Sequence, residues 1–245
     1  MIELPIAAIF PEDPPESFPD VNTALAEPDG LLAIGGDLSA ERLLAAYKCG
    51  IFPWYSEGEP ILWWAPERRA VLFTKEFDCS RSLRKRIRSG YFDVSANQCF
   101  SDVIRQCAAT RQETGTWITP EMLYAYNELH RLGFAHSIEC WRNGELVGGL
   151  YGVRLGRVFF GESMFSTVSD ASKVALATLV QLCDSIDIPM IDCQQPSAHL
   201  SRLGMRLISR DKFSGLLSDL IAKDTDNAAA QDSWIIPPRP SSLPD

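Results

Sequence analysis

A segment near the middle of the chain constrains the fold most strongly, because two tight turns divide it into three expected strands. The dipeptide Asn143-Gly144 favours a type I′ turn, whose twist matches that of the two strands it joins. It predicts a hairpin between strands over residues 134–141 and 145–153. A second tight turn at Leu155-Gly156 leads into a third strand over 157–161. The segment therefore predicts an antiparallel meander.

Helical segments flank this meander on both sides. Ser39 is the expected N-cap of a helix that runs through Lys48 and stops at Gly50. After the meander, a strand over 190–194 is expected between helices. Helices, then a meander, then helix–strand–helix predict an α/β fold with a mixed sheet. The remaining expected elements are a strand at 70–74 and helices at 80–89, 100–111, 119–132, 169–185, 198–203 and 210–221.

The N-terminal region differs from the rest in its charge and its proline content. Its first 41 residues carry nine acidic residues and no basic one, and prolines cluster within residues 11–19, so we expect an extended segment. Aromatic residues and prolines then crowd 51–64, which favours a rigid, irregular wall. We predict a small N-terminal domain over 1–67, a larger domain over 68–222, and a tail over 223–245 that is loosely held except at 234–236.

The overall charge excludes a protein that is basic over its whole surface. Lys and Arg number 23 and Asp and Glu number 32, which gives a formal net charge of −9. Any nucleic-acid site must therefore be a local patch. No run reaches the roughly 18 apolar residues of a membrane helix, and the first residues lack the positive charge of a signal peptide. The seven cysteines are odd in number and form no CxxC pair, which indicates reduced thiols in a cytoplasmic protein.

The sequence offers no motif for a metal or a bound cofactor. Neither of the glycine-rich phosphate loops, GxxxxGK(S/T) and GxGxxG, is present, so ATP and dinucleotide use lack support. Only three histidines occur, and His130 and His136 are not at metal-ligand spacing with any cysteine. We therefore expect no cofactor and no metal.

A cluster of positive charge stands out against this acidic background. The expected helix at 80–89 places Arg81, Arg84, Lys85 and Arg88 on one face, opposite Leu83 and Ile87. Most charge runs are solvated helix faces, and that remains one interpretation. Because every charge in this run is positive, we favour the binding of an anion, and phosphates are the natural candidate.

The expected strand at 190–194 carries two polar side chains in an otherwise apolar element. Strand alternation places Asp192 and Gln194 on one face and Cys193 on the other. The structural interpretation is a satisfied polar pair or a loop cap. The functional one is a pair of acceptors that orients an amine and helps to remove its proton. Cys193 is a poor candidate nucleophile, because no histidine is evident as its base.

Glu162 is a second candidate. It follows Gly161 at the expected end of an aromatic strand, and Met164, Phe165 and Ser166 precede the next helix. The carboxylate is either an exposed strand end or a charge at the lip of an apolar pocket. Such a pocket suits a ligand with one hydrophobic arm and one cationic group.

Together these segments resemble the leucyl/phenylalanyl-tRNA–protein transferase family. The resemblance covers about residues 20–222 and follows the order of the family's motifs, which makes it highly specific although each motif alone is weak. The matching segments are Glu27-Pro-Asp-Gly-Leu-Leu-Ala-Ile-Gly-Gly-Asp-Leu38, Gly50-Ile-Phe-Pro-Trp54, Leu62-Trp-Trp-Ala-Pro66, Gly115-Thr-Trp-Ile-Thr119, Ala135-His-Ser-Ile-Glu139, Leu146-Val-Gly-Gly-Leu-Tyr-Gly152, Gly161-Glu-Ser-Met-Phe-Ser166 and Ile191-Asp-Cys-Gln194.

The resemblance implies a fold, a reaction and a set of site residues. It implies a small N-terminal domain, a larger domain similar to the GNAT acyltransferases, and transfer of Leu or Phe from tRNA to the N-terminal amine of proteins that begin with Arg or Lys. The product carries an N-terminal degradation signal. The family's catalytic positions match Glu162, Asp192 and Gln194. Its tRNA-binding helix matches Arg81, Arg84, Lys85 and Arg88, in a different charge order. Its amino-acid pocket matches Tyr47, Trp54, Trp117, Tyr126, Leu150, Phe159, Met164, Ser166, Leu179 and Ile191.

Two of these positions depart from the family pattern, since Leu150 and Leu179 stand where Met and Phe are expected. An aminoacyl ester is already activated, so the implied reaction needs no ATP, which agrees with the missing phosphate loops. A carboxylate relay from Asp192 through Gln194 would favour the nucleophilic amine, and Glu162 would bind either the amine or the acceptor's cationic side chain. We expect a monomer that does not bind membranes.

Two rival functions remain open at this point. The first is an ordinary acyl-CoA-dependent GNAT enzyme, which should carry a Q/R-x-x-G-x-G/A pyrophosphate loop before a helix, and none is present. The second is a non-catalytic module that binds tRNA whatever amino acid is attached. Asp192 and Gln194 together speak against that second function.

Overall fold

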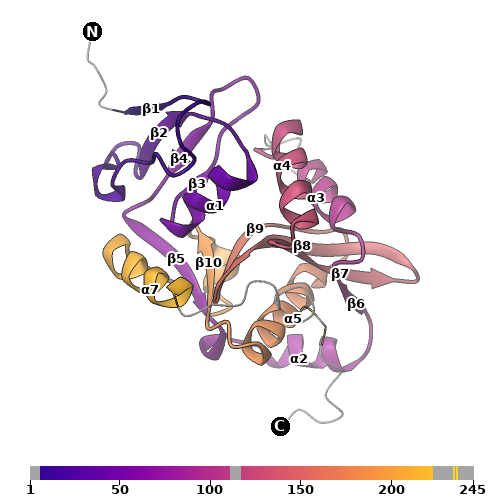
Figure 1. Ribbon diagram of the computed structural model, residues 1–245. Helices are drawn as coiled ribbons and strands as arrows, with labels where there is room; N and C mark the ends of the chain where they lie inside the picture. Colours follow the sequence, from indigo (N-terminus) through magenta and orange to yellow (C-terminus); the bar gives the residue numbers. More distant parts are fainter. Residues whose placement is uncertain (1–5, 111–116, 223–233, 235, 237–245) are drawn as a thin grey trace.

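Two β-sheets organise the described part of the chain, which comprises residues 6–110, 117–222, 234 and 236 of the computed structural model (Figure 1). The larger sheet contains β5 (Arg68–Phe73), β6 (Asp93–Ala96), β7 (Ala135–Arg142), β8 (Glu145–Leu155), β9 (Val158–Ser166), β10 (Met190–Gln194) and β11 (Arg206–Ser209). The smaller, N-terminal sheet contains β1 (Ala7–Ile9), β2 (Leu31–Gly35), β3 (Phe52–Pro53) and β4 (Leu62–Trp64).

The larger sheet has the strand order β11-β5-β10-β9-β8-β7-β6. Its neighbouring strands are antiparallel, except that β9 and β10 run parallel. Parallel neighbours need a crossover connection, and here a helix over Ala171–Ser185 provides it. The mixed sheet confirms the predicted α/β class. The meander of β7, β8 and β9 is confirmed too, with positive φ at both Asn143 and Gly144 as a type I′ turn requires.

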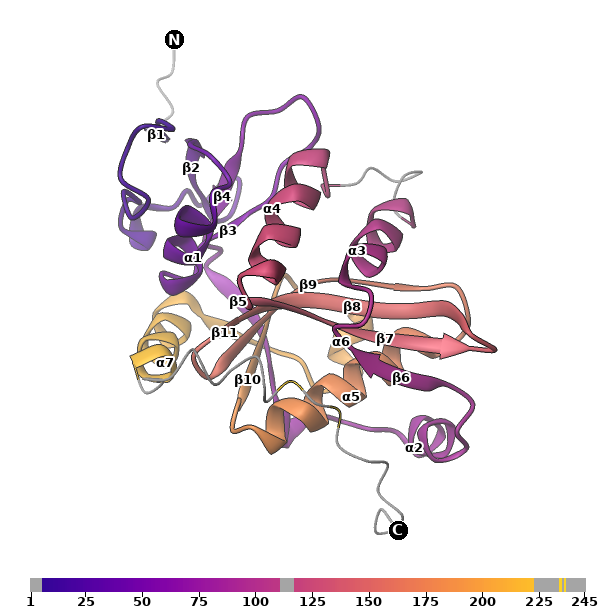
Figure 2. The same cartoon turned by 45° about the vertical axis from the view of Figure 1, so that its right-hand side comes forward.

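Helices cover both faces of the larger sheet (Figure 2). They are α1 (Ala40–Lys48), α2 (Arg81–Arg88), α3 (Phe100–Ala109), α4 (Pro120–Arg131), α5 (Ala171–Ser185), α6 (Ala198–Ser201) and α7 (Arg210–Ala222), with short 3₁₀ turns at Val21–Thr23 and Thr74–Glu76. Helices α3 and α4 lie on one face of the sheet and α5 on the other. Ten of the 15 residues of α5 are buried, so this helix is apolar on most of its circumference.

The predicted helices are all present, with ends within a few residues of those expected. Their starts follow from capping: the hydroxyls of Ser39, Ser80 and Thr119 accept hydrogen bonds from backbone N–H groups three residues further on. The expected last residue of the helix at 100–111 lies outside the described residues.

The N-terminal region is more regular than predicted. The prediction of an irregular wall over 51–64 is wrong for Phe52–Pro53 and Leu62–Trp64, which pair in an antiparallel ladder, and it agrees with residues 54–61, which lie outside the strands. The sheet has the order β1-β2-β4-β3. Its strands β3 and β4 have only two and three residues, too short to produce an alternation that a sequence pattern can detect, and the proline sits on an edge strand where a missing N–H costs little.

Strand β9 extends further than predicted, through Ser166 instead of ending at Gly161. It continues because it pairs with β8 on both sides of a register shift at Glu162, from Val158 opposite Leu155 to Ser166 opposite Gly148. Glu162 therefore lies within a strand and not at its end. The short strands β6 and β11 were not predicted.

The division at residue 67 stays a prediction, as do the exact domain bounds. The predicted tail at 223–245 lies outside the described residues except at Trp234 and Ile236, of which Trp234 is buried and Ile236 half-buried. Across the described ranges, no helix combines the length and the apolar character that crossing a bilayer requires.

Candidate active site

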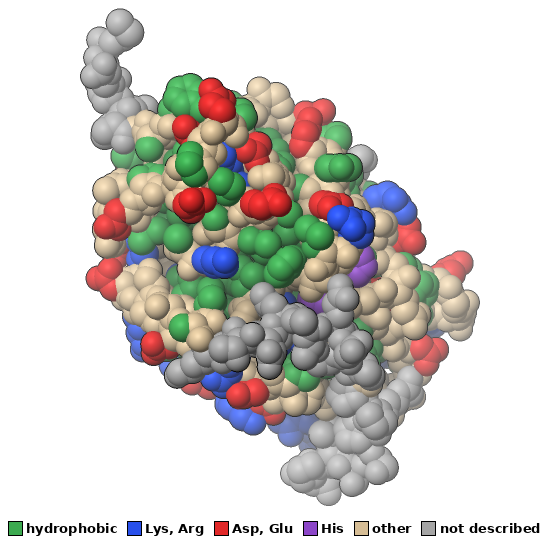
Figure 3. All heavy atoms as spheres, in the orientation of Figure 1, with side chains coloured by type: hydrophobic (Ala, Val, Ile, Leu, Met, Phe, Trp, Pro, Cys, Tyr) green, Lys and Arg blue, Asp and Glu red, His purple; other side chains and the backbone are tan. Residues whose placement is uncertain are grey.

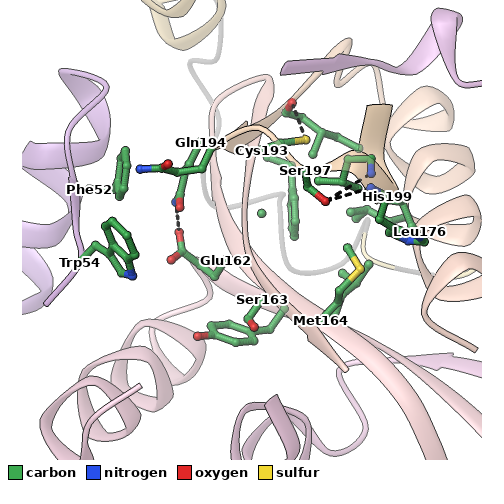
Figure 4. Close-up of a pocket in the computed structure, with 18 of the residues that line it drawn as sticks. Phe52, Trp54, Glu162, Ser163, Met164, Leu176, Cys193, Gln194, Ser197 and His199 are labelled. Carbon is green, nitrogen blue, oxygen red and sulfur yellow. Dashed lines mark hydrogen bonds between the residues drawn. The ribbon is translucent and has the colours of Figure 1, made fainter. Parts of the chain in front are cut away.

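A cavity of about 370 Å³ opens where β9 and β10 lie side by side (Figure 4). Figure 4 shows Phe52 and Trp54 on one side of the cavity and Leu176 and His199 on the other. Phe52 belongs to β3 of the N-terminal sheet, and Trp54 directly follows that strand. Apolar side chains form most of the wall, and Glu162 and Gln194 are joined by a hydrogen bond at its edge. An apolar space with a few placed polar groups is typical of a small-molecule site.

The carboxylate of Glu162 accepts hydrogen bonds from three side chains. Tyr47 of α1 donates to Oε1 at 2.7 Å, and Tyr126 of α4 donates to Oε2 at 3.0 Å. The amide Nε2 of Gln194 donates to Oε1 at 2.9 Å. Glu162 is buried, and neither tyrosine has any exposed surface. One carboxyl group thus gathers side chains from α1, α4 and β10.

The two tyrosines and Glu162 form a ring of three short contacts, since the hydroxyl oxygens of Tyr47 and Tyr126 lie 2.6 Å apart. When the carboxylate is ionised, two hydroxyl hydrogens serve these three contacts. When Glu162 carries a proton, it can donate to one tyrosine and accept from the other, and every contact then holds a hydrogen. The ring can therefore hold Glu162 in either protonation state.

Burial raises the pKa of Glu162 to about 7, because desolvation penalises the carboxylate. The negative charge of Asp192 acts in the same direction, while the hydrogen bonds from Tyr47, Tyr126 and Gln194 oppose it. Burial also raises the pKa of both tyrosines well above the usual value, so both hydroxyls keep their protons at neutral pH. Glu162 exchanges its proton near neutral pH, as a general acid or base should.

Asp192 contacts Arg69 instead of the cavity. The guanidinium donates from Nε to Oδ1 at 2.8 Å and from Nη2 to Oδ2 at 2.7 Å, and Oδ1 also accepts the backbone N–H of Gln194 at 2.9 Å. Both partners are buried, and Arg69 packs against the rings of Phe52 and Phe213 at 4.6 and 4.7 Å. Asp192 is therefore linked to the cavity through the backbone of Gln194.

The pairing of β10 is irregular at its end. The pairing of β10 with β5 shifts register between Asp192 and Gln194, and Gln194 has a left-handed φ of 60°. Cys193 and Gln194 both line the cavity, from opposite sides of the strand. The prediction that Asp192 and Gln194 share one face, with Cys193 on the other, agrees with these contacts, since Arg69, the partner of Asp192, packs against Phe52, and Figure 4 shows Gln194 directed toward Phe52 and Cys193 directed away from it.

The residues predicted for an amino-acid pocket fall into three groups. Tyr47 and Tyr126 contact the carboxylate of Glu162. Ser166 is exposed and is not among the residues that line the cavity; its hydroxyl donates to the carbonyl of Val168, just before α5. The other seven line the cavity, and these are Trp54, Trp117, Leu150, Phe159, Met164, Leu179 and Ile191.

Arg69 is the main residue that the sequence reasoning missed. The one signal for it in the sequence is a basic residue directly before the apolar run Ala70-Val71-Leu72. A buried strand that carries a basic residue could be expected to pair with another buried strand that carries an acidic one. The cavity-lining residues Phe52, Leu176, Ser197 and His199 were also missed. They come from three separate elements, which only the folded chain brings together.

Helix α2 presents the predicted basic residues to solvent. Arg81, Arg84, Lys85 and Arg88 are exposed, and Leu83 is buried on the opposite side. Acidic side chains are spread over the part of the face in Figure 3 that the N-terminal elements form. Helix α2 thus exposes four positive charges in a chain whose formal net charge is −9.

Cys193 also lines the cavity. Burial raises the pKa of Cys193, so its thiol keeps its proton at neutral pH. Within the described residues, no group of three or more His, Cys, Asp or Glu side chains is placed to hold a metal ion.

Comparison with known proteins gives consistent matches along most of the chain. The family model described as "Leucyl/phenylalanyl-tRNA protein transferase" matches residues 71–218, and the model of its N-terminal domain matches 36–67. The chain is 55% identical over 205 residues to the leucyl/phenylalanyl-tRNA–protein transferase of Nitrosospira multiformis, covering 83% of this chain and 88% of the relative. It is 51% identical over 223 residues to that of Nitrosomonas eutropha, covering 91% and 94%.

Solved structures give weaker similarities. The structure of FemX matches with a TM-score of 0.45 and 10% identity, covering 73% of this chain and 71% of FemX. A GCN5-related N-acetyltransferase-like protein from Streptococcus suis matches with a TM-score of 0.35 and 18% identity, covering 66% and 61%. Similarities this distant say nothing about the reaction.

Proposed function

Because the chain belongs to the leucyl/phenylalanyl-tRNA–protein transferase family, we propose that it moves Leu or Phe from aminoacyl-tRNA to the N-terminal amine of an acceptor protein. The acceptors are proteins that begin with Arg or Lys, as the sequence resemblance implies, and the product carries an N-terminal degradation signal. The enzyme is an aminoacyltransferase that uses no cofactor.

One observation carries this proposal beyond family membership: a buried carboxyl group with a pKa of about 7 stands at the wall of an apolar cavity. The reaction needs both features. The donated side chain is apolar and needs an apolar space. The acceptor amine has an ordinary pKa near ~8 and is mostly protonated at neutral pH, so it needs a base.

Glu162 is the base in this proposal. Its carboxylate takes a proton from the acceptor ammonium, and the free amine attacks the carbonyl carbon of the aminoacyl ester. A C–N bond forms, the nitrogen gives up a second proton, and the C–O bond to the tRNA ribose breaks. The departing ribose oxygen takes up one of the two protons, and the other leaves to solvent. The ring formed with Tyr47 and Tyr126 can hold Glu162 before and after it takes the proton.

Gln194 orients the amine. Its amide nitrogen is committed to Glu162, which leaves the amide oxygen as an acceptor for an N–H of the amine. Asp192 and Arg69 are positioning residues: they fix the backbone N–H of Gln194 and hence the direction of its side chain. Alignment of amine and ester contributes to the rate by itself.

The apolar cavity receives the donated side chain, and α2 contacts the tRNA. The seven cavity-lining residues that match the family pocket support the first assignment, and the exposure of Arg81, Arg84, Lys85 and Arg88 supports the second. We also propose a monomer that acts in the cytoplasm, in keeping with seven cysteines without a disulfide.

The test is a transfer assay with defined substrates. The protein is incubated with Leu-tRNA and a peptide that begins with Arg, and the peptide is weighed. We expect a mass gain of one leucine residue, no gain with a peptide that begins with Glu, and no gain with free leucine plus uncharged tRNA. Transfer from acetyl-CoA in place of aminoacyl-tRNA would contradict the proposal, and so would tRNA binding without any transfer.

A further inference from the structure

Trp234 lies in the core, although the sequence around it is rich in Asp, Ala, Pro and Ser. Its side chain is 4% exposed. It stacks on two rings from the larger sheet: His136 of β7, with centroids 4.2 Å apart and planes at 23°, and Phe159 of β9, at 5.5 Å and 16°. Near-parallel stacking on aromatic rings from two strands indicates that the indole of Trp234 has a defined packing position in the core.

The first of these rings cannot move easily. His136 is 1% exposed, and its Nδ1 lies 3.0 Å from the side-chain nitrogen of Asn97. Because that amide nitrogen donates, Nδ1 accepts and the ring is neutral, with its hydrogen on Nε2. The side-chain oxygen of Asn97 in turn accepts the backbone N–H of Ser137. The ring of His136 is therefore held in place against the indole of Trp234.

The second ring belongs to the cavity wall. Phe159 lines the cavity and has no exposed surface. Its ring lies so close to Gly152 of the neighbouring strand that a Cβ there would stand 2.5 Å from Cε1 and 2.7 Å from Cζ. Phe159 is therefore restrained by the backbone of β8 as well as by Trp234. Of these two restraints, only Trp234 is a side chain that a substitution can remove.

We propose that Trp234 is a specificity-determining residue, which fixes the position of Phe159 and thereby the size of the cavity that receives the donated side chain. This role rests on the proposed function. Protein interiors are packed densely enough that removing a large side chain leaves space into which its neighbours relax. Without Trp234 the ring of Phe159 gains room to leave the cavity, and the cavity then admits bulkier donors than Leu or Phe.

The test compares the use of Leu-tRNA, Phe-tRNA and Trp-tRNA by four proteins in competition. The wild type, Trp234→Gly and Trp234→Phe test the packing of residue 234 against Phe159, and Ile104→Ala is the control. Ile104 has no exposed surface and lies on α3, across the sheet from α5, so its truncation destabilises the protein without touching this cavity wall. We expect Trp234→Gly to raise the use of Trp-tRNA relative to Leu-tRNA by about tenfold, the scale on which an apolar wall discriminates. Trp234→Phe should restore most of the wild-type ratio, and Ile104→Ala should leave it unchanged.

Added indole provides a second readout that is independent of tRNA. Indole should raise the melting temperature of Trp234→Gly, but not that of the wild type or of Ile104→Ala, and it should return the donor ratio toward the wild-type value. An unchanged ratio in Trp234→Gly with normal wild-type transfer would overturn the role of Trp234 alone. An equal change in Ile104→Ala would overturn it as well, because general loosening would then explain the effect. Absence of transfer by the wild type would instead overturn the proposed function itself, together with this role.

Discussion

The pKa of Glu162 determines the pH range in which its carboxylate can accept a proton. With a pKa of about 7, the carboxylate form becomes dominant as the pH rises through neutrality. We predict that kcat/KM for an acceptor peptide rises with pH through a midpoint near 7, since this parameter reports groups of the free enzyme. Glu162→Gln should lose about 10²- to 10⁴-fold in rate, the usual contribution of general base catalysis. A Gln variant with the wild-type rate and midpoint would exclude Glu162 as the base.

The same pKa makes a prediction about stability. The folded-state pKa of about 7 lies above the ordinary glutamate value of ~4.3, so between these values the folded protein binds more protons than the unfolded chain. Stability therefore falls as the pH rises through this window. The Glu162→Gln variant has no carboxyl group to ionise at this position, so it lacks this pH-dependent loss of stability. Its free energy of unfolding relative to that of the wild type should therefore increase between pH 4.5 and 7, by at most about 3 kcal/mol. Thermal melts at pH 5 and pH 8 measure this. Equal differences at both pH values would contradict the raised pKa.

Arg69 and Asp192 should behave as one unit. Each is buried, so removing either leaves an uncompensated charge, which typically costs about 3–5 kcal/mol. We predict that Arg69→Met and Asp192→Leu are each strongly destabilising and that the double variant is much less so than their sum. All three variants should lose transfer, because the N–H of Gln194 loses its acceptor or that acceptor's support, while tRNA binding by α2 remains. Denaturant melts and a tRNA-binding assay measure both effects. Additive stabilities would show that the two side chains are not coupled.

At the residue scale, sequence reasoning found Glu162 and Gln194 but not the partners that give them their chemistry. A carboxylate in an aromatic segment is visible in a sequence. The burial that raises its pKa is not, and neither are the hydrogen bonds from Tyr47 and Tyr126, which come from two helices distant in the sequence. Arg69 was missed for the same reason, since its partner Asp192 stands 123 positions away.

Helix α2 offers a test of anion binding at the scale of one element. Neutralising Arg81, Arg84 and Lys85 together should weaken tRNA binding and reduce the slope of log K against log salt by up to about 0.9 for each phosphate that the helix no longer neutralises. Arg86→Gln is the matched control. Arg86 stands on the same helix, but it stacks over the ring of Tyr91 and lies 3.8 Å from Asp170. A titration over several salt concentrations measures the slope, and a slope unchanged in the triple variant would make α2 a solvated face.

Element by element, the sequence predicted what local signals specify and missed what pairing specifies. Helices were predictable because caps such as Ser39 and Thr119 are local. The end of β9 was not, because its last four residues are held by their partners on β8. The small sheet was not predicted either, since strands such as β3 are defined almost entirely by their partner.

Across the whole molecule, the site joins the N-terminal region to the larger sheet. Tyr47 and Phe52 come from residues before the predicted boundary at 67, and Glu162 and Gln194 come from residues after it. Neither part contains the complete ring around Glu162. The N-terminal region therefore contributes directly to the chemistry and is more than a cover for the cavity.

Two tyrosines that cross this boundary separate its chemical role from its structural one. Tyr47 donates to Glu162 at 2.7 Å, whereas the hydroxyl of Tyr55 lies 3.3 Å from that of Thr119 at the start of α4, away from the carboxyl group. A donor to the ionised form lowers a carboxyl pKa, so its loss raises that pKa. We predict that Tyr47→Phe shifts the midpoint of the kcat/KM profile to higher pH and that Tyr55→Phe leaves it in place. Both variants should lose about 1 kcal/mol of stability, the usual net value of one hydrogen bond. If both shifted the midpoint equally, the tyrosines would act by holding the two parts of the molecule together, and the ring around Glu162 would have no special part in setting its proton affinity.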